Sequence, residues 1–377
     1  MFKLPRYREP NFNTPFFMAA PDVITAEVKQ TGVAPSGYHS TSMYPEYFKI
    51  DGEWRLIENT RMDCVPVIKK DGQIEAKEFR RLKIGDRVIL GRTEDGREGI
   101  YLYTEGFSAG DTKGDIFAFR SGRSRETSFS NDYLRLAQLL QHDREHGHIV
   151  WVLGPAAVFD DESRKVMEFM VENRYCHAVF GGNAVATHDI EGALFHTALG
   201  QDLTTTENKP NGHYHHLDAI NLIRRLGSVE EAVKQGYITN GLVHSCVKNK
   251  VPMVLAGSIR DDGPLPQVES NAVEVQDTMR VHTNKATTIV CLATQLHTIA
   301  TGNLTPSYVV CNGEIRPVFI YAVDVSEFVL NKITDRGTLE VTTIVSNIQD
   351  FLFKLRKIME RDEYGYTRSN KEKSAPL

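Results

Sequence analysis

From residue 148 onward, short apolar segments alternate with segments that have helical periodicity. Six apolar segments, rich in β-branched residues, are predicted to be strands: 149–153, 178–180, 253–256, 288–292, 317–323 and 341–345. Strand–helix alternation of this kind is typical of a parallel sheet that helices cover on both faces. This part of the chain is therefore predicted to be an α/β domain.

Capping residues mark several of the predicted helices. Ser228-Val229-Glu230-Glu231 has the spacing of a capping box, and its helix is predicted to end near Gly236. Asn347 is placed to open the last helix, which is predicted to run through Leu355. The residues after it are charged and rich in Ser and Lys, so 361–377 is predicted to be a flexible tail.

The first part of the chain has a different pattern, in which short β-like runs are separated by turns. The runs are 47–50, 54–57, 65–69 and 87–90. Asp-Gly pairs between apolar runs, such as Asp51-Gly52, favour hairpins. Because 377 residues exceed one average core, we expect two domains. They are a smaller, mostly antiparallel β-domain over 1–125 and the α/β domain over 126–360.

Composition excludes several classes of protein. A net charge of -5 with mixed signs gives no basic footprint, so no nucleic-acid partner is expected. No apolar run approaches the roughly 20 residues of a membrane span, and none at the start resembles a signal peptide. The chain has five cysteines: Cys64, Cys176, Cys246, Cys291 and Cys311. Their odd number and lack of CxxC spacing indicate reduced thiols in a soluble, cytoplasmic protein.

Small and polar residues gather where the predicted strands of the α/β domain end. They include Gly181-Gly182-Asn183, the run from Gly257 to Asp262, Ala293-Thr294 and Asp324. In an open α/β sheet, ligands bind beyond the carboxyl ends of the strands. The sequence therefore predicts a ligand site at this edge.

Two of these segments have a natural role in nucleotide binding. Gly181 and Gly182 would let the backbone approach a pyrophosphate, with amides of the following helix as donors; a tight strand-to-helix turn is the alternative. No GxGxxG is present. Asp324 is placed where an acid accepts from ribose hydroxyls, and a helix cap, which Ser326 can also provide, is the alternative.

Asp261 and Asp262 are candidates for proton transfer or cofactor binding, since neighbouring carboxylates can have separated pKa values. The alternative is a surface turn before Pro264.

Two other features, a histidine cluster and a cysteine, favour simpler interpretations than a metal site or a nucleophile. His213-x-His215-His216 lacks a matched distant ligand set, so helix capping or substrate contact is favoured over a metal. Cys246 is expected to be a buried, unreactive thiol.

The same segments carry a family resemblance. GGNAVATHDIE (181–191), CVKNKVPMVLAGSIRDDGPLP (246–266) and LATQLHTIATGN (292–303) resemble the nucleotide-binding half of the LOR/SDH-related ornithine cyclodeaminases of archaea and cyanobacteria. Residues 36–64 and 82–91 resemble that family's substrate-side β-domain. The resemblance implies a Rossmann-like domain similar to that of deoxyhypusine synthase, with NAD as cofactor.

Carried over residue by residue, the resemblance implies roles for individual side chains. With Gly182, the expected cofactor-binding residues are Asn183, Ala184, Asp262, Thr294, Leu296, His297, Thr298, Asp324 and Val325. Asp261 and Asp262 are the expected catalytic residues. On the substrate side, Arg61 would pair with a carboxylate and Glu58 or Asp63 with an ammonium group, beside Asn59; surface charges are the alternative for each.

The expected function is an NAD-dependent amino-acid cyclodeaminase, a lyase that converts ornithine or a similar diamino acid to proline or its analogue and ammonia, with NAD recycled internally. One alternative is an NAD-dependent amino- or imino-acid dehydrogenase with another substrate. Another is a non-catalytic NAD-binding regulator. The expected partners are a small amino-acid substrate and further copies of the chain in a homo-oligomer, without nucleic acid, membrane or metal.

Overall fold

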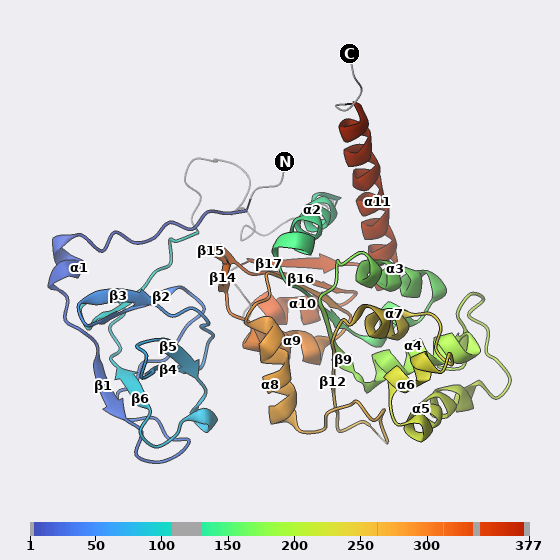
Figure 1. Ribbon diagram of the computed structural model, residues 1–377, viewed down its shortest axis with the longest axis horizontal. Coiled ribbons are helices and arrows are strands. Elements are labelled where there is room, and N and C mark those ends of the chain that lie inside the picture. Colours follow the sequence, from blue (N-terminus) through green and yellow to red (C-terminus); the bar gives the residue numbers. More distant parts are fainter. Residues whose placement is uncertain (1–3, 108–129, 262, 312, 335–339, 373–377) are drawn as a thin grey trace.

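The computed structural model describes residues 4–107, 130–261, 263–311, 313–334 and 340–372. Figure 1 shows a smaller part built from strands, in blue, beside a larger part in which helices surround a sheet. Both predicted classes of architecture are present: α/β with a parallel sheet, preceded by antiparallel β structure. Among the described residues, no helix is long and apolar enough to cross a bilayer.

The large sheet is fully parallel and has six strands. They are β8 (Ile149–Leu153), β9 (Ala178–Gly182), β12 (Met253–Ala256), β13 (Thr288–Leu292), β16 (Phe319–Asp324) and β17 (Glu340–Val345). Their spatial order is β12-β9-β8-β13-β16-β17, so the first strand lies centrally and the chain builds outward in both directions. This is the order of a doubly wound nucleotide-binding sheet. All six predicted strands are confirmed.

One strand boundary and one hairpin were not foreseen. Pro317 was predicted to begin the fifth strand, but it ends β15 (Glu314–Pro317), which pairs with β14 (Tyr308–Cys311) in an antiparallel hairpin. Proline lacks an N–H group and suits an edge strand of this kind. The large sheet resumes two residues later, at Phe319.

Helices cover both faces of the sheet. They are α2 (Ser130–His146), α3 (Asp161–Glu172), α4 (Asn183–Phe195), α5 (His215–Leu226), α6 (Val229–Lys234), α7 (Leu242–Asn249), α8 (Ala272–Thr283), α9 (Gln295–Leu304), α10 (Glu327–Thr334) and α11 (Ile348–Glu372). Trp151 points into a core with α2, α3, α4 and α11, whereas Val150 and Val152 point into a second core with α8, α9 and α10. This alternation follows from the two-residue period of a strand.

The predicted caps can be checked directly. The hydroxyl of Ser228 accepts a hydrogen bond of 3.1 Å from the backbone N–H of Glu231, and the side chain of Asn347 accepts one of 2.9 Å from that of Gln349. Both caps are confirmed. The predicted end at Leu355 is wrong, because buried Met359 continues the apolar face and α11 extends to Glu372. Figure 1 shows this helix projecting from the body. The predicted flexibility of 361–377 remains a prediction.

The β-domain consists of two antiparallel sheets. One joins β1 (Ile24–Glu27), β6 (Arg87–Leu90), β4 (Val65–Ile68) and β5 (Ile74–Lys77), and the other joins β3 (Glu53–Leu56), β2 (Glu46–Ile50) and β7 (Ile100–Leu102). A short helix, α1 (Pro15–Ala19), precedes them. Asp51 and Gly52 have φ of 54° and 81°, as expected for a hairpin turn that needs two positive φ angles.

Candidate functional site

The candidate site lies at the carboxyl edge of the large sheet, between β8 and β13. After β8 the chain turns toward α3 on one face, and after β13 it turns toward α9 on the other. The two strand ends approach closely, because Gly154 donates a 2.8 Å hydrogen bond to the carbonyl of Leu292. A Cβ on Gly154 would collide with the carbonyl oxygen of Ala293. Because the two connections leave toward opposite faces at this point, a crevice forms beyond the strand ends, and such sheets bind ligands there.

The next strand ends in the predicted glycine pair. A Cβ on Gly181 would lie 2.6 Å from Cγ1 of Val185, so the strand-to-helix turn has no room for a side chain there. Gly182 is the N-cap of α4 and provides no side chain to cap the helix, and Ala184 is exposed in the first turn. The helix therefore presents backbone amides with a partial positive charge at the carboxyl edge, a suitable donor set for a phosphate group.

Asn183 joins α4 to the loop that follows β12. Its side-chain oxygen accepts hydrogen bonds of 3.0 Å from the backbone N–H of Leu265 and 3.1 Å from the hydroxyl of Thr187. The loop bearing Asp261 is thus held beside the glycine turn. Asn183 therefore positions the loop through its side chain, and its predicted contact with the cofactor remains a prediction.

His297 is the side chain on which these segments converge. Its Cε1 would lie 3.3 Å from a Cβ on Gly182, and its Nδ1 lies 3.0 Å from the hydroxyl of Thr294, the N-cap of α9. Burial lowers the pKa of His297, and the negative charge of Asp261 opposes this effect only in part. His297 is therefore a neutral imidazole near pH 7, available as a hydrogen-bonding group at the edge.

The structure describes only one of the two predicted catalytic aspartates, Asp261. A carboxylate oxygen of Asp261 accepts a 2.8 Å hydrogen bond from the backbone N–H of Ser258, while the carbonyl of Ser258 accepts from the N–H of Asp261. The alternative interpretation, a surface turn, therefore describes the local geometry. The charge of Asp261 nevertheless acts on His297. Asp262 lies outside the described residues.

The remaining cofactor candidates also lie at the carboxyl edge. Asp324 ends β16, and one of its two carboxylate oxygens accepts a 2.8 Å hydrogen bond from the backbone N–H of Ser326, in a turn that precedes α10. Its predicted contact with a ribose remains a prediction. The sheet therefore brings every described cofactor candidate to one edge. Two of the side chains, Leu296 and Val325, are 70% and 68% exposed there, and Thr298 is buried.

Sequence reasoning missed a buried His–Glu pair one to two turns into α4. Nδ1 of His188 lies 2.9 Å from Glu191, whose carboxylate also accepts from Thr197 and from two backbone N–H groups. Burial raises the pKa of Glu191, but the hydrogen bonds from His188, Gly200 and Thr197 outweigh it, and the net pKa is lowered. An ionised Glu191 holds the proton of His188 on Nδ1. Histidine and glutamate three positions apart after a glycine turn could have signalled this pair.

The histidines considered as an alternative metal site have other contacts. Nδ1 of His215 lies 2.8 Å from the hydroxyl of Thr197, and its ring stacks on Phe195 with centroids 4.7 Å apart. In the described part of the chain, no three His, Cys, Asp or Glu side chains gather as a metal site. Cys246 is buried in α7, and burial raises its pKa, which agrees with an unreactive thiol.

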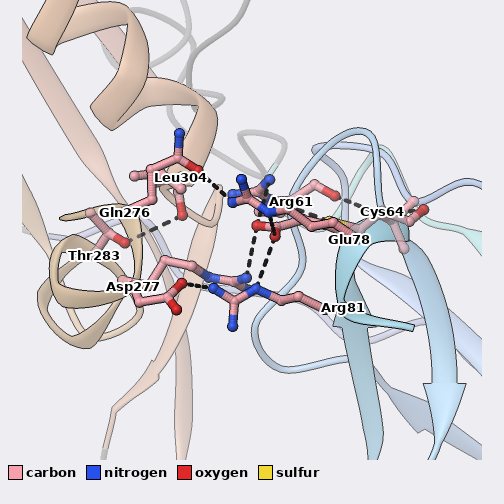
Figure 2. A network of polar contacts seen from close by, with 11 residues as sticks. Arg61, Cys64, Glu78, Arg81, Gln276, Asp277, Thr283 and Leu304 are labelled. Carbon is pink, nitrogen blue, oxygen red and sulfur yellow. Dashed lines mark hydrogen bonds and ion pairs between the residues drawn. The ribbon is translucent and has the colours of Figure 1, made fainter. Parts of the chain in front are cut away.

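The predicted substrate residues do not join the cofactor candidates. Glu58 and Asn59 line a cleft between the β-domain and the hairpin β14–β15, and the Nη2 atom of Arg61 lies 3.0 Å from Glu78 (Figure 2). Asp63 is exposed, with a φ of 62°. Glu58 and Asn59 share this cleft with Arg280 and Asn284, at the end of α8 that leads into β13, so they lie toward the amino edge of the sheet. Local sequence patterns do not encode how two domains dock, which is why their position could not be foreseen.

Family comparisons agree with this architecture. The family described as "Arginine dihydrolase ArgZ-like, C-terminal, Rossmann fold" matches residues 135–355. The region described as "Arginine dihydrolase ArgZ-like, C-terminal, first region" matches residues 45–126. The two matches cover the sheet domain and most of the β-domain.

Curated relatives match most of the chain. It is 40% identical over 334 residues to ornithine cyclodeaminase of Methanopyrus kandleri, covering 88% of this chain and 76% of the relative. It is 35% identical to the bifunctional arginine dihydrolase/ornithine cyclodeaminase ArgZ of Synechocystis, covering 90% of this chain and 47% of ArgZ.

Solved structures share the fold. A conserved putative LOR/SDH protein from Methanococcus maripaludis superposes with a TM-score of 0.81 and 34% identity, covering 91% of this chain and 99% of that one. The ternary complex of AgrE with ornithine and NAD+ superposes with a TM-score of 0.58 and 32% identity, covering 91% of this chain and 46% of that one.

Proposed function

The chain belongs to the family of archaeal ornithine cyclodeaminases and ArgZ-like C-terminal regions, and from this premise we propose that it is an NAD-dependent ornithine cyclodeaminase. The reaction closes the ring of ornithine to give proline and releases ammonia. Archaeal relatives at 35–40% identity carry the name ornithine cyclodeaminase. A structure of AgrE, a relative of similar identity, contains ornithine and NAD+.

The convergence of Gly182, Thr294 and Asp261 on His297 carries the proposal for the cofactor. A dinucleotide needs a turn without side chains for its pyrophosphate, amide donors, and an acid for its ribose. The glycine turn and first turn of α4 would hold the pyrophosphate. Asp324 has a second carboxylate oxygen to offer a ribose hydroxyl. The residues present therefore fit NAD.

When bound, NAD supplies a hydride acceptor that becomes the donor later in the same turnover, so no net NADH is released. The chain's own residues position the substrate and move protons. Asp261 and Asp262 are our proposed proton-transfer residues, with Asp261 acting beside His297. His188 is a further candidate, because Glu191 fixes its tautomer with Nε2 as the proton acceptor.

We also propose that the protein is a homo-oligomer. Leu296, Val325 and Ile259 are large apolar side chains exposed at or beside the carboxyl edge. A second copy covering this edge would bury them and exclude water from a reaction whose imine would otherwise hydrolyse. Sedimentation of the purified protein with and without NAD tests this part.

A turnover assay tests the activity. Purified protein with NAD and L-ornithine should release ammonia and proline in equal amounts, without accumulating NADH. Accumulation of NADH in proportion to turnover would instead indicate an amino-acid dehydrogenase. Binding of NAD without any product from ornithine or other diamino acids would contradict the proposed activity and favour a regulator.

A further inference from the structure

A short hairpin after α4 encloses the carboxylate of Glu191. The hairpin joins β10 (Thr197–Ala198) to β11 (Gln201–Asp202) through a two-residue turn, in which Leu199 and Gly200 have φ of 51° and 74°. Two positive φ angles are typical of the tight turns that hairpins prefer. Both turn residues donate their backbone N–H to Glu191, Gly200 at 2.9 Å and Leu199 at 3.1 Å. The turn is therefore a small anion site that the chain fills with its own carboxylate.

The acceptor positions of Glu191 are all occupied. Its Oε1 atom accepts from the hydroxyl of Thr197 at 2.8 Å and from the N–H of Gly200. Its Oε2 atom accepts from the N–H of Leu199 and lies 2.9 Å from Nδ1 of His188. A carboxylate has about four lone-pair positions, so none is left for a substrate. Glu191 is therefore a fixed anion, and a proton that moves must be carried by His188.

Thr197 links this carboxylate to a second histidine. Its single hydroxyl hydrogen is donated to Glu191, because an ionised carboxylate cannot donate. The 2.8 Å contact between this hydroxyl and Nδ1 of His215 must therefore be donated by His215. The ring of His215 also stacks on Phe195 at the end of α4, with 18° between the two planes. His215 is thus held in one orientation, and it fixes the hydroxyl of Thr197 toward Glu191.

Close packing restrains the hairpin. Thr197 and Glu191 are fully buried. A Cβ on Gly200 would lie 2.6 Å from the carbonyl carbon of Gly212, so the turn packs directly against the backbone of η4 (Gly212–Tyr214), which leads into α5. Because α5 begins with His215, the donors to Glu191 and the residues that support them belong to one packed unit.

The other end of this series of contacts is open to a ligand. Among the described residues, Nε2 of His188 makes no hydrogen bond, and it stays accessible although His188 is 7% exposed. His188 lies one turn after Ala184, on the same face of a helix that begins at the carboxyl edge. The ring of Phe159, in the connection after β8, packs edge-on against that of His188 at 5.3 Å. Nε2 is therefore the atom of His188 that a ligand at this edge can reach.

We propose that the β10–β11 hairpin positions His188 for proton transfer, with Thr197 and His215 as positioning residues that act through Glu191. This inference rests on the proposed function and adds to it the residues that orient its proton acceptor. With Glu191 fixed, neutral His188 keeps its proton on Nδ1, and Nε2 accepts a proton from the substrate ammonium group. The imidazolium formed lies beside an anion that compensates its charge, and it returns the proton to the ammonia that leaves.

Thr197→Val tests the positioning role, because valine has nearly the shape of threonine without its hydroxyl. We expect kcat for proline formation to fall about tenfold or more, as loss of a hydrogen bond to a charged group implies, while KM for L-ornithine and the affinity for NAD change by less than about twofold. Thr197→Ser keeps the hydroxyl and should recover most of kcat. Thr205→Val is the matched control, since Thr205 is exposed in the segment after β11. Unchanged kcat in Thr197→Val, or an equally low kcat in Thr197→Ser, would overturn the proposal.

The tautomer of His188 provides a second measurement, which needs no turnover. Nitrogen-15 NMR of the full chain with labelled histidine distinguishes a ring nitrogen that carries a proton from one that does not, and the signals of His188 are those lost in His188→Gln. At about pH 8, where histidine is neutral, we expect the proton on Nδ1 in the unmodified chain. Thr197→Val, and His215→Phe, which keeps a ring against Phe195, should both give a mixture of tautomers.

The two measurements separate this inference from the proposed function. A proton on Nε2 of His188 in the unmodified chain would overturn the inference even if the protein forms proline from ornithine. A chain that forms no proline, but shows the Nδ1 tautomer and its loss in Thr197→Val, would contradict the proposed function and support the positioning of His188 by the hairpin.

Discussion

The side-chain oxygen of Asn183 accepts a hydrogen bond of 3.0 Å from the backbone N–H of Leu265, 82 positions later in the chain. This bond closes the loop after β12 onto the first turn of α4. Asn183→Ala would leave the N–H of Leu265 without that partner, at a cost of about 1–3 kcal/mol. We expect the affinity for NAD to fall about tenfold or more and the free energy of unfolding to fall by no more than this cost, measured by calorimetry and by urea titration.

Asn208→Ala is the matched control for this variant. Asn208 lies in an exposed hairpin and accepts from Gln201, far along the chain from the loop after β12. NAD affinity in this control should equal that of the unmodified chain. An unchanged affinity in Asn183→Ala would mean that the loop does not contribute to cofactor binding.

His188→Gln tests the buried pair in α4. Glutamine can still donate to Glu191, so the fold and NAD binding should persist, but it cannot take up a proton. We expect kcat for proline formation to fall about 10²–10⁴-fold with little change in KM, the range typical of lost proton transfer. His196→Gln, at an exposed histidine, is the control. A fall of less than about threefold would refute this role.

Gly154→Ala tests the close approach of β8 and β13. The added methyl group would collide with the carbonyl oxygen of Ala293, and relief requires the two strand ends to separate. We expect the free energy of unfolding to drop by about 1–3 kcal/mol in urea titrations. Gly182→Ala places its Cβ 3.3 Å from a side-chain atom of His297, which can shift, so its stability should change less. Equal stability of the two variants would contradict this account.

Stability should fall in mild acid because of a stacked group of histidines. The ring of His148 stacks on the rings of His177 and His282, and its centroid lies 5.5 Å from the centroid of each. Burial, with the charges of Lys285 and the neighbouring histidines, lowers the pKa of His148 from 6.5 to about 3. Below pH 6.5 the unfolded chain therefore takes up this proton before the folded chain does. The contribution of His148 to the free energy of unfolding is complete above pH 6.5 and is lost progressively as the pH falls toward 3.

The expected loss from His148 alone is about 2 kcal/mol near pH 5, from the shift of pKa. His148→Phe keeps a stacked ring without a titrating group, so its thermal midpoint should change less between about pH 7.5 and pH 5 than that of the unmodified chain. His196→Gln, at an exposed histidine, should keep the full pH dependence. Equal pH dependence in His148→Phe would show that other groups are responsible.

Much of the sheet domain could be predicted because its signals are local. Apolar β-branched runs gave the six strands, and Ser228 and Asn347 gave two helix starts through caps that depend only on near neighbours. The polar strand ends also follow from parallel topology, since such ends must share one edge. Gly182 and His297 are expected at one edge for this reason, and in the structure a Cβ on Gly182 would lie 3.3 Å from Cε1 of His297.

What could not be predicted depends on contacts between distant segments. Arg61 contacts Glu78, a pairing that no local pattern indicates, and its expected contact with a substrate carboxylate remains a prediction. The docking of Arg81 on Asp277 joins residues almost two hundred positions apart and has no periodic signature. The role of His188 could not be predicted, because a histidine in a helix can serve several functions and its partner, here Glu191, decides which one applies.

The central position of β8 has a consequence for synthesis of the chain. β8 pairs on one side with β9, which follows soon after, but on the other side with β13, which begins only at Thr288. During translation, one edge of β8 therefore remains unpaired until more than a hundred further residues have left the ribosome. An exposed edge strand of this kind is a template for association with other chains. Nascent chains that end before β13 should thus be the species most in need of a chaperone.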